Sequence, residues 1–310
     1  MAAPLTTETF LADPVLAAAR DAAHIAVARM THWRTRLDEA AVSVKDNPND
    51  LLTVADQEIE ALVTGYLHRH RPDDVVIGEE GVAALSLEDL PGGAELAAGL
   101  CGPGAGDSAR IEWHVDPIDG TVNFVRGLEQ HCFSIGAKDL ATGQWLVGLV
   151  AAPALRTVWF ARAGQGAWRT GALPGAIPGA GRGDDTSPPP PHEHMFVRLA
   201  GTPAGRRGRV VATGFGYSPA LRAIQLAALP LVMEGFDDLR RGGSAALDLC
   251  AAAEGRVNAY YERDLGVYDW AAGALIAEEA GLVVQRPDGP GELTIVADTA
   301  ERLEFLRARA

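Results

Sequence analysis

Cysteine is scarce in this chain of 310 residues, which contains only Cys101, Cys132 and Cys250. Three is an odd number, and no two of these residues have the C-x-x-C spacing, so the sequence favours neither a disulfide framework nor a zinc site. Unpaired thiols are typical of proteins in a reducing compartment. We therefore expect a cytoplasmic protein.

Long apolar runs and basic runs are missing as well. No stretch of about 18 apolar residues occurs, and residues 1–10 contain neither Lys or Arg nor a long apolar core, so we expect no membrane span and no targeting signal. The formal net charge is −14 and no run of Lys or Arg exceeds two residues, which argues against a nucleic-acid or anionic membrane partner. A phosphorylated substrate would need cations to screen these acids, and this need favours a metal site.

Apolar residues make up 47% of the chain, enough for a substantial core in one large or two moderate domains. Apolar positions three to four residues apart predict helices over residues 13–38 and from about residue 53 onward. Strands separated by turn residues predict an antiparallel meander, over residues 132–137, 145–150 and 157–161. After residue 195 strands and helices alternate, which indicates an α/β region following an α+β region.

These patterns divide the chain into two regions and a connecting loop. We predict an N-terminal α+β region over residues 1–190 and a C-terminal α/β region over residues 195–310. Residues 171–194 are rich in Gly and Pro, which is typical of a loop rather than of a packed core. The segment His192-Glu193-His194 in this loop has no further ligand group nearby, so we interpret it as solvated rather than metal-binding.

The most informative stretch of the chain is WHVDPIDGT at residues 113–121. We expect a short strand over residues 111–115, after which the proline fixes a backbone φ and the glycine allows a sharp turn into a helix. Asp116 and Asp119 would project from this corner, where carboxylates suit Mg²⁺ and helix N–H groups suit an anion. A turn with a capping Asp or Thr explains an isolated D-x-x-D-G-T equally well. Acids elsewhere in the chain must therefore decide between a metal site and a capped turn.

Further acids occupy positions where ligands often collect. Glu79 follows an apolar strand at residues 75–78, at the carboxyl end where α/β folds place ligands, although an exposed acid is the alternative. Asp269 stands at the start of a later helix, where it could simply be an N-cap. Asp56 stands at the start of an earlier helix, where it could form a capping box with Thr53.

Taken together and in order, Glu79, the DPIDGT segment at residues 116–121 and Asp269 with its neighbours resemble the three signatures of the inositol monophosphatase family of metal-dependent phosphatases. The resemblance extends from about residue 45 to about residue 297. The central motif is specific, whereas each flanking motif alone is weak. The resemblance implies a mixed α+β and α/β fold, namely the layered αβαβα sandwich of the inositol monophosphatase and fructose-1,6-bisphosphatase type.

The resemblance also implies a role for each acid. Two or three Mg²⁺ ions would be held by five residues: Glu79, Asp116, Ile118 through its carbonyl, Asp119 and Asp269. Asp116 would bridge two of the ions, and a metal-activated water would attack the phosphoryl group without a covalent enzyme intermediate. Thr121 and Glu79 would orient this water, and Asp56 would hydrogen-bond Thr121.

The sequence evidence for the substrate contacts is weaker. The resemblance implies that they are made by Asp119, Gly120, Thr121, Gly243, Ser244, Ala245, Glu262 and Asp269. Glu262 would bind a substrate hydroxyl, and Lys45 would lie near the mouth of the site. A helix start for Ser244, a surface acid for Glu262 and a solvated lysine are the alternatives. The family usually has Trp at the position of Tyr268 and often Thr at the position of Ser244, and residues 88–109 look like an insertion. These departures leave the substrate open.

We therefore predict a Mg²⁺-dependent phosphomonoesterase that acts on inositol 1-phosphate or a similar small polyol phosphate. Alternatives within the same fold are histidinol-phosphate phosphatase, fructose-1,6-bisphosphatase and 3′-phosphonucleotide phosphatase. Alternatives of another class are a non-catalytic binding protein and a structural calcium site. The resemblance further implies a homodimer that is sensitive to lithium.

Overall fold

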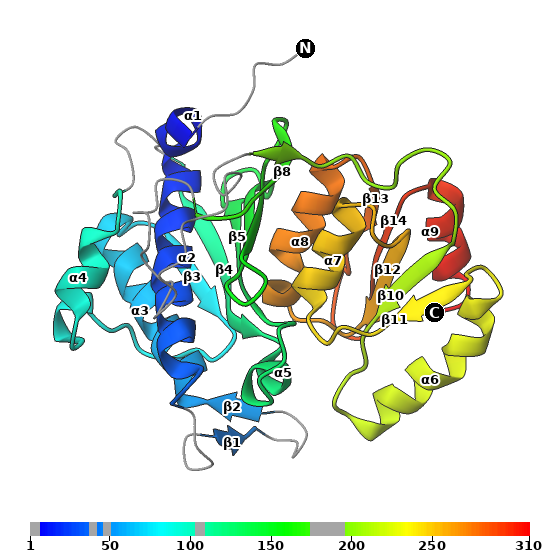
Figure 1. Ribbon diagram of the computed structural model, residues 1–310, viewed down its shortest axis with the longest axis horizontal. Helices are drawn as coiled ribbons and strands as arrows, with labels where there is room; N and C mark the ends of the chain where they lie inside the picture. Colours follow the sequence, from blue (N-terminus) through cyan, green and yellow to red (C-terminus); the bar gives the residue numbers. More distant parts are fainter. Residues whose placement is uncertain (1–6, 37–41, 46–50, 103–108, 174–195) are drawn as a thin grey trace.

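A computed structural model describes residues 7–36, 42–45, 51–102, 109–173 and 196–310 of the chain. Helices and sheets alternate in five layers, in the order helix, sheet, helix, sheet, helix (Figure 1). This arrangement confirms the predicted layered αβαβα sandwich. Within the described residues, no helix is both long and apolar enough to cross a membrane.

Most helices of the first half lie on one side of the first sheet (Figure 1). They are α1 (Thr7–Ala12), α2 (Pro14–Trp33), α3 (Val54–His70), the 3₁₀ helix η2 (Leu87–Asp89) and α4 (Gly93–Ala98), while the short α5 (Thr121–Val125) lies at the end of β4. A separate antiparallel pair of strands consists of β1 (Val42–Val44) and β2 (Leu51–Thr53).

Seven strands form the first sheet. In spatial order they are β3 (Val75–Gly78), β4 (Ile111–Asp119), β5 (Cys132–Asp139), β6 (Trp145–Ala152), β7 (Thr157–Arg162), β8 (Gly166–Thr170) and β9 (Val197–Arg198). β3 and β4 are parallel, and every later pair is antiparallel. The predicted meander of β5, β6 and β7 is therefore confirmed, and it continues through β8 and β9, which were not predicted.

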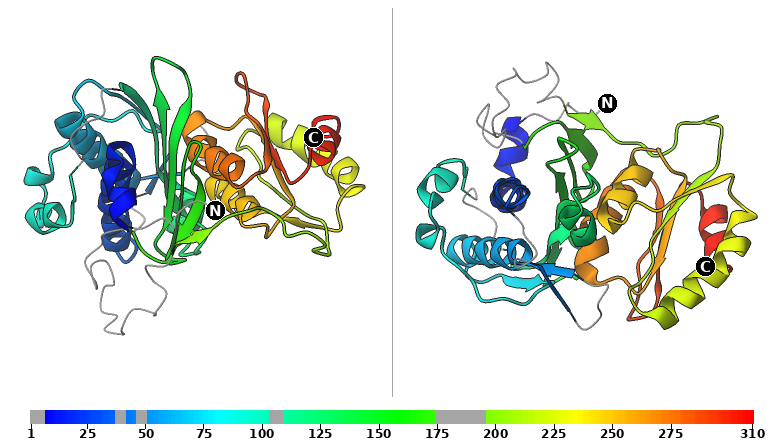
Figure 2. Two further views of the ribbon diagram at one scale, coloured as in Figure 1. Left: turned by 90° about the horizontal axis from the view of Figure 1, so that it is seen from above. Right: turned by 60° about the horizontal axis from the view of Figure 1, so that its bottom comes forward.

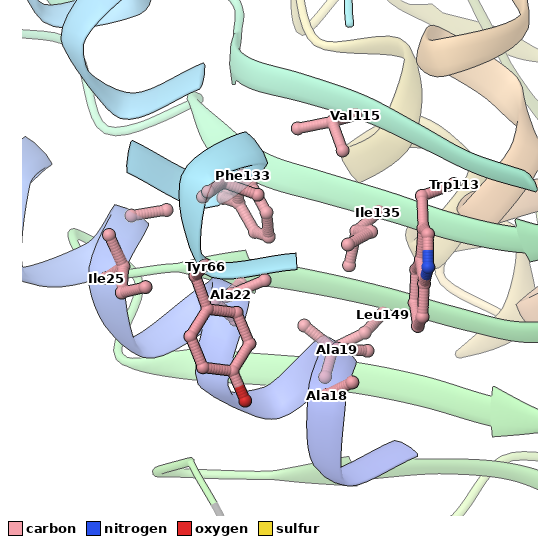
Figure 3. Close-up of a cluster of buried hydrophobic side chains, with 14 of the residues drawn as sticks. Ala18, Ala19, Ala22, Ile25, Tyr66, Trp113, Val115, Phe133, Ile135 and Leu149 are labelled. Atoms are coloured by element: carbon pink, nitrogen blue, oxygen red, sulfur yellow. The ribbon is translucent and has the colours of Figure 1, made fainter. Parts of the chain in front are cut away.

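Small residues on α2 let this helix pack closely on the first sheet. Ala18, Ala19 and Ala22 are buried in one cluster with Trp113 and Leu149 of the sheet (Figure 3). Alanines allow the two backbones to approach, and the larger sheet side chains fill the remaining space. The helix ends at Trp33 rather than near residue 38, because its buried face stops at Met30 and residues 34–36 are exposed.

The described part of the predicted insertion, residues 88–102, contains η2 and α4. Leu90 and Leu96 of this segment pack against the first core cluster. The buried carboxylate of Asp21 on α2 accepts hydrogen bonds from the backbone N–H groups of Cys101 (3.1 Å) and Gly102 (2.8 Å). The segment is therefore anchored to α2.

The middle layer is the helix pair α7 (Ala245–Ala253) and α8 (Val267–Glu279), which lies between the two sheets (Figure 2). Gly148 of β6 permits this packing, because a Cβ at that position would lie 2.5 Å from the carbonyl oxygen of Ala272. α8 begins at Val267, two residues before Asp269, where the sequence predicted the helix start.

Five strands form the second sheet, in the order β11 (Asp238–Arg240), β10 (Val210–Thr213), β12 (Ala259–Arg263), β14 (Leu293–Ala297) and β13 (Val283–Gln285). β10 is parallel to both of its neighbours, and β14 is antiparallel to both of its own. The outer helices are α6 (Pro219–Met233) and α9 (Ala300–Arg307) (Figure 1). The predicted alternation of strands and helices is thus confirmed, apart from β11, whose polar sequence has no strand pattern.

Candidate active site

An irregularity in β4 turns two aspartates toward the same side of the sheet. Asp116 pairs with Ser134 of β5 and Asp119 pairs with Cys132, so β4 has one residue more than β5 between these pairs. Residues three apart on a regular strand point to opposite faces, and an inserted residue brings them back to the same face. β4 therefore runs to Asp119, beyond the strand end predicted at residue 115, and the two acids lie on a bulged strand end.

Gly120 makes the sharp turn that was predicted after these acids. Its φ is +90°, in the left-handed region that favours glycine. A Cβ at this position would lie 2.7 Å from the carbonyl oxygen of Gln130. Both the backbone conformation and the close approach require a glycine, and α5 begins at the next residue, Thr121.

The carboxylates of Asp116, Asp119 and Asp269 meet in space, with ligand oxygens that all lie within 4.8 Å of one another. Oδ1 of Asp116 is buried and has no hydrogen-bond partner among the described residues. Burial, with repulsion from Glu79, Asp119 and Asp269, raises the pKa of Asp116 well above its ordinary value. Burial also raises the pKa of Asp119 to about 6, and burial with the neighbouring carboxylates raises the pKa of Asp269 strongly.

This arrangement fits a divalent cation. A buried carboxylate oxygen without a partner is costly unless a proton or a cation satisfies it. Clustered carboxylate oxygens are the donors that Mg²⁺ prefers in proteins. The Asp116 oxygen therefore points to a cation held jointly with the other two aspartates.

Asp119 is held in place by the start of α7. The hydroxyl of Ser244 and the backbone N–H of Ala246 both donate to Oδ2 of Asp119, each at 2.7 Å. Ser244 is also the N-cap of α7, and its Oγ accepts from the backbone N–H of Leu247 at 3.3 Å. These bonds connect the second half of the chain directly to the acid cluster on β4.

Asp269 is the third residue of α8. Its Oδ2 accepts a hydrogen bond from the backbone N–H of Gly266 at 2.7 Å, and Gly266 is the N-cap. The interpretation of Asp269 as the N-cap itself is therefore wrong, because the helix begins at Val267. The reach back to Gly266 orients the carboxylate and satisfies one free N–H group of the helix start.

Asp56 makes both of the contacts that were considered for it. With Thr53 it forms a capping box at the start of α3, in which the Thr53 N–H donates to Asp56 Oδ2 at 2.8 Å. Its other oxygen, Oδ1, accepts a hydrogen bond from the hydroxyl of Thr121 at 3.2 Å. The same hydroxyl lies 3.0 Å from the carbonyl oxygen of Ile118. Burial raises the pKa of Asp56 to about 7.

Glu79 follows β3 and stands at the edge of the acid cluster. Its Oε1 accepts from Nζ of Lys45 at 2.7 Å, and the same ammonium group lies 2.7 Å from Oε1 of Glu80. Lys45 thus places one positive charge beside Glu79, which lines a cavity over the acids, while Lys45 itself is not among the lining residues.

A cavity of about 300 Å³ opens over these acids, a volume suited to a small ligand. All predicted site residues except Asp56 line it: Glu79, Asp116, Ile118, Asp119, Gly120, Thr121, Gly243, Ser244, Ala245, Glu262 and Asp269. Asp56 contacts the lining residue Thr121 instead. Residues from both halves of the chain therefore share one cavity.

The cavity lining also includes polar groups from α7 and β12. Oε2 of Glu262 accepts from the hydroxyl of Tyr260 at 2.6 Å, and burial raises the pKa of Glu262 to about 7. Asp248 and Arg241 also line the cavity and were not predicted. Asp248 lies one helical turn after Ser244, and this spacing could have indicated it. Burial raises the pKa of Asp248 to about 8.

The loop predicted over residues 171–194 is described only as far as residue 173. Its segment His192-Glu193-His194 lies outside the described residues.

The profile of the inositol monophosphatase family matches residues 11–304 of the chain. A protein named inositol-1-monophosphatase from Mycobacterium bovis is 37% identical over 274 residues, which cover 87% of this chain and 81% of that protein. A protein named Nus factor SuhB from Haemophilus influenzae is 30% identical over 248 residues, covering 79% and 75%.

Solved structures agree with this relationship. Mycobacterium tuberculosis SuhB is 33% identical, covers 96% of each chain and has a TM-score of 0.67. The extragenic suppressor protein suhB from Bartonella henselae is 26% identical, covers 95% of this chain and 97% of its own, and has a TM-score of 0.68. The chain therefore belongs to the inositol monophosphatase family, a family of metal-dependent phosphatases.

Proposed function

We propose that the chain is a Mg²⁺-dependent phosphomonoesterase that acts on inositol 1-phosphate or a similar small polyol phosphate. The observation that carries this proposal is the unpartnered buried oxygen of Asp116, which lies beside Asp119 and Asp269 in the cavity wall. Glu79 and Ile118 line the same cavity, and the Glu79 carboxylate and the Ile118 carbonyl would complete the set of oxygen donors for two or three ions. When bound, Mg²⁺ would polarise the phosphoryl group and make water a stronger nucleophile.

The chain's own residues are arranged to orient a water molecule. The hydroxyl of Thr121 donates its one proton to Asp56 Oδ1 (3.2 Å) or to the carbonyl oxygen of Ile118 (3.0 Å), so a lone pair of Thr121 Oγ1 remains to accept a hydrogen bond from water. The Glu79 carboxylate, which lines the same cavity, is a second acceptor. We assign Thr121 and Glu79 to the orientation of the attacking water and Asp56 to the orientation of Thr121.

Direct attack by water is favoured because the cysteine closest to the site is a poor nucleophile. Cys132 is buried on β5, 3.5 Å from the hydroxyl of Ser244. Burial raises the pKa of its thiol well above the ordinary value, so the reactive thiolate is suppressed at neutral pH. No covalent enzyme intermediate is therefore proposed.

On the substrate side, we propose that the segment from Asp119 to Thr121 meets the phosphate and that Glu262 accepts a substrate hydroxyl. Tyr260 fixes one oxygen of Glu262 and leaves the other for a ligand. The hydroxyl of Ser244 already donates to Asp119, so the contribution of the segment 243–245 to substrate binding would come largely from its backbone.

Phosphate release from four substrates in the presence of Mg²⁺ tests the assignment: inositol 1-phosphate, histidinol phosphate, fructose 1,6-bisphosphate and a 3′-phosphonucleotide. We expect the highest kcat/KM for inositol 1-phosphate and a raised KM for it in Glu262→Gln. Absence of turnover of any inositol phosphate would overturn the substrate assignment but not the family.

We also propose a cytoplasmic homodimer that is inhibited by Li⁺ and has no nucleic-acid or membrane partner. The net charge of −14 supports the last point, although several relatives are named Nus factors. Light scattering on the purified chain would test the dimer.

A further inference from the structure

Glu60 is a buried acid that lies outside the predicted set of site residues. It belongs to α3, one turn after Asp56, and only 1% of its surface is exposed. Its carboxylate accepts hydrogen bonds from the backbone N–H groups of Glu80 (Oε2, 2.8 Å) and Val82 (Oε1, 3.1 Å). Two backbone N–H groups of one short loop thus converge on one carboxylate, an arrangement of charge-assisted bonds.

The chain that wraps around Glu60 is the loop that begins with Glu79. Gly78, immediately before it, packs so closely that a Cβ there would lie 2.1 to 2.4 Å from the carboxyl atoms of Glu60. Gly81 has a φ of +62°, which favours glycine. The shape of the loop is therefore adapted to the carboxylate inside it.

The first residue of the loop, Glu79, is hydrogen-bonded to β4, the strand that carries Asp116 and Asp119. The backbone N–H of Glu79 donates to the carbonyl oxygen of Val115 at 3.1 Å, and Val115 directly precedes Asp116. Glu60 holds the backbone N–H groups of Glu80 and Val82, so the backbone on both sides of the Glu79 side chain is fixed. The Glu79 side chain itself forms an ion pair with Lys45, and the side chains of this pair are about one-fifth exposed.

We propose that Glu60 is a positioning residue, which holds the Glu79 carboxylate in the metal site by fixing the backbone of residues 79–82. The inference rests on the proposed function, in which Glu79 is a metal ligand. Groups that orient metal ligands typically change metal affinity about 10- to 100-fold when they are removed. Loss of Glu60 should therefore weaken metal binding, although Glu60 itself does not line the cavity.

Glu60→Gln is the test variant, because glutamine has nearly the same volume but turns an NH₂ group toward backbone N–H groups. Glu58→Gln on the same helix is the matched control. Glu58 accepts hydrogen bonds from Nε of Arg29 (2.5 Å) and Nε1 of Trp33 (3.1 Å), away from the cavity. Each variant removes one carboxylate that accepts two hydrogen bonds. Only the Glu60 carboxylate contacts the loop that begins with Glu79.

Two measurements on the substrate-free protein separate positioning from general stability. Hydrogen exchange of the amides of Glu80 and Val82, in the metal-free state, should be faster in Glu60→Gln and unchanged in Glu58→Gln. Calorimetric titration with Mn²⁺ and with Mg²⁺ should give a Kd about 10- to 100-fold higher in Glu60→Gln and a wild-type Kd in Glu58→Gln. A purely structural role would lower the Tm of both variants without changing either Kd.

A wild-type metal Kd in Glu60→Gln would overturn the inference. If that variant does not fold, Glu60→Asp serves in its place, because it keeps the charge but shortens the side chain by one methylene. A wild-type metal Kd together with fast amide exchange in Glu60→Asp would also overturn the inference. Failure of the proposed function is a distinct result, since the wild-type protein itself would then neither bind Mg²⁺ nor release phosphate.

Discussion

Replacing Asp116 by asparagine should make the metal-free protein more stable above about pH 6. The buried Asp116 oxygen has no partner, and the ligand oxygens of the three aspartates lie within 4.8 Å of one another. At an effective dielectric constant of about 20, two unit charges at this separation repel by about 3.5 kcal/mol. Asparagine keeps the shape of the side chain and removes one of these charges.

The gain in the free energy of unfolding should be about 3 kcal/mol, close to the repulsion energy of one pair of charges. The repulsion in the other carboxylate pairs is already reduced by partial protonation, so it adds little to the gain. An unfolding entropy of about 2.1 cal/mol/K per residue gives about 0.65 kcal/mol/K for this chain, so Tm should rise by about 5 °C. Burial raises the pKa of Asp119 to about 6, and a raised carboxyl pKa means that stability falls as pH rises through that range. The gain from Asp116→Asn should therefore be large at pH 8 and small at pH 5.

Thermal unfolding followed by circular dichroism, in EDTA and in excess Mg²⁺, measures this effect. Mg²⁺ at about 100 times its Kd should stabilise the wild-type protein by about 2.7 kcal/mol and leave Asp116→Asn unchanged. Asp21→Asn is the contrasting control, because Asp21 is a buried acid that is fully partnered by Arg20 and Tyr66, and its replacement should lower Tm. A lower Tm for Asp116→Asn at pH 8, or equal stabilisation of both proteins by Mg²⁺, would refute the reasoning.

Three further predictions follow from the same contacts. The Mg²⁺ concentration for half-maximal activity should fall as pH rises through about 6. Carboxylates bind metal only when deprotonated, and burial raises the pKa of Asp119 to about 6. Mg²⁺ titrations of activity below and above pH 6 measure this change. Ser244→Ala should lower the free energy of unfolding by about 1 kcal/mol through loss of the α7 N-cap, and should raise the Mg²⁺ requirement because Asp119 loses a donor, whereas Ser244→Thr should keep both. Gly120→Ala should lower the free energy of unfolding in urea by at least about 1–2 kcal/mol, given its φ of +90°.

The acids of the site could be predicted from the sequence because each stands in a short local pattern. Asp116 and Asp119 share one motif, and Glu79 and Asp269 each follow a recognisable change from one element to the next. Local patterns also predicted the meander and the order of helices and strands. Residue spacing alone could not reveal the bulge in β4, because an extra residue in a strand is defined only by its pairing with β5.

Other features depend on contacts between distant segments. Ser244 was expected to touch the substrate, yet its hydroxyl donates to Asp119, 125 residues earlier in the chain. Glu60 reads in the sequence as one more polar residue of an amphipathic helix, and only the loop after β3 explains why it is buried. β11 is polar and three residues long, and its strand conformation depends on its parallel pairing with β10.

Phosphate release by metal-stripped protein tests the central claim, that the acids at the end of β4 hold a catalytic divalent cation. Inositol 1-phosphate should be incubated with wild-type protein and with Asp116→Asn across a titration of Mg²⁺. We predict that wild-type activity is absent without the metal and rises to saturation as Mg²⁺ is added, while the variant stays at background throughout. Phosphate release by the stripped wild-type protein, or a wild-type Mg²⁺ response in Asp116→Asn, would contradict the claim.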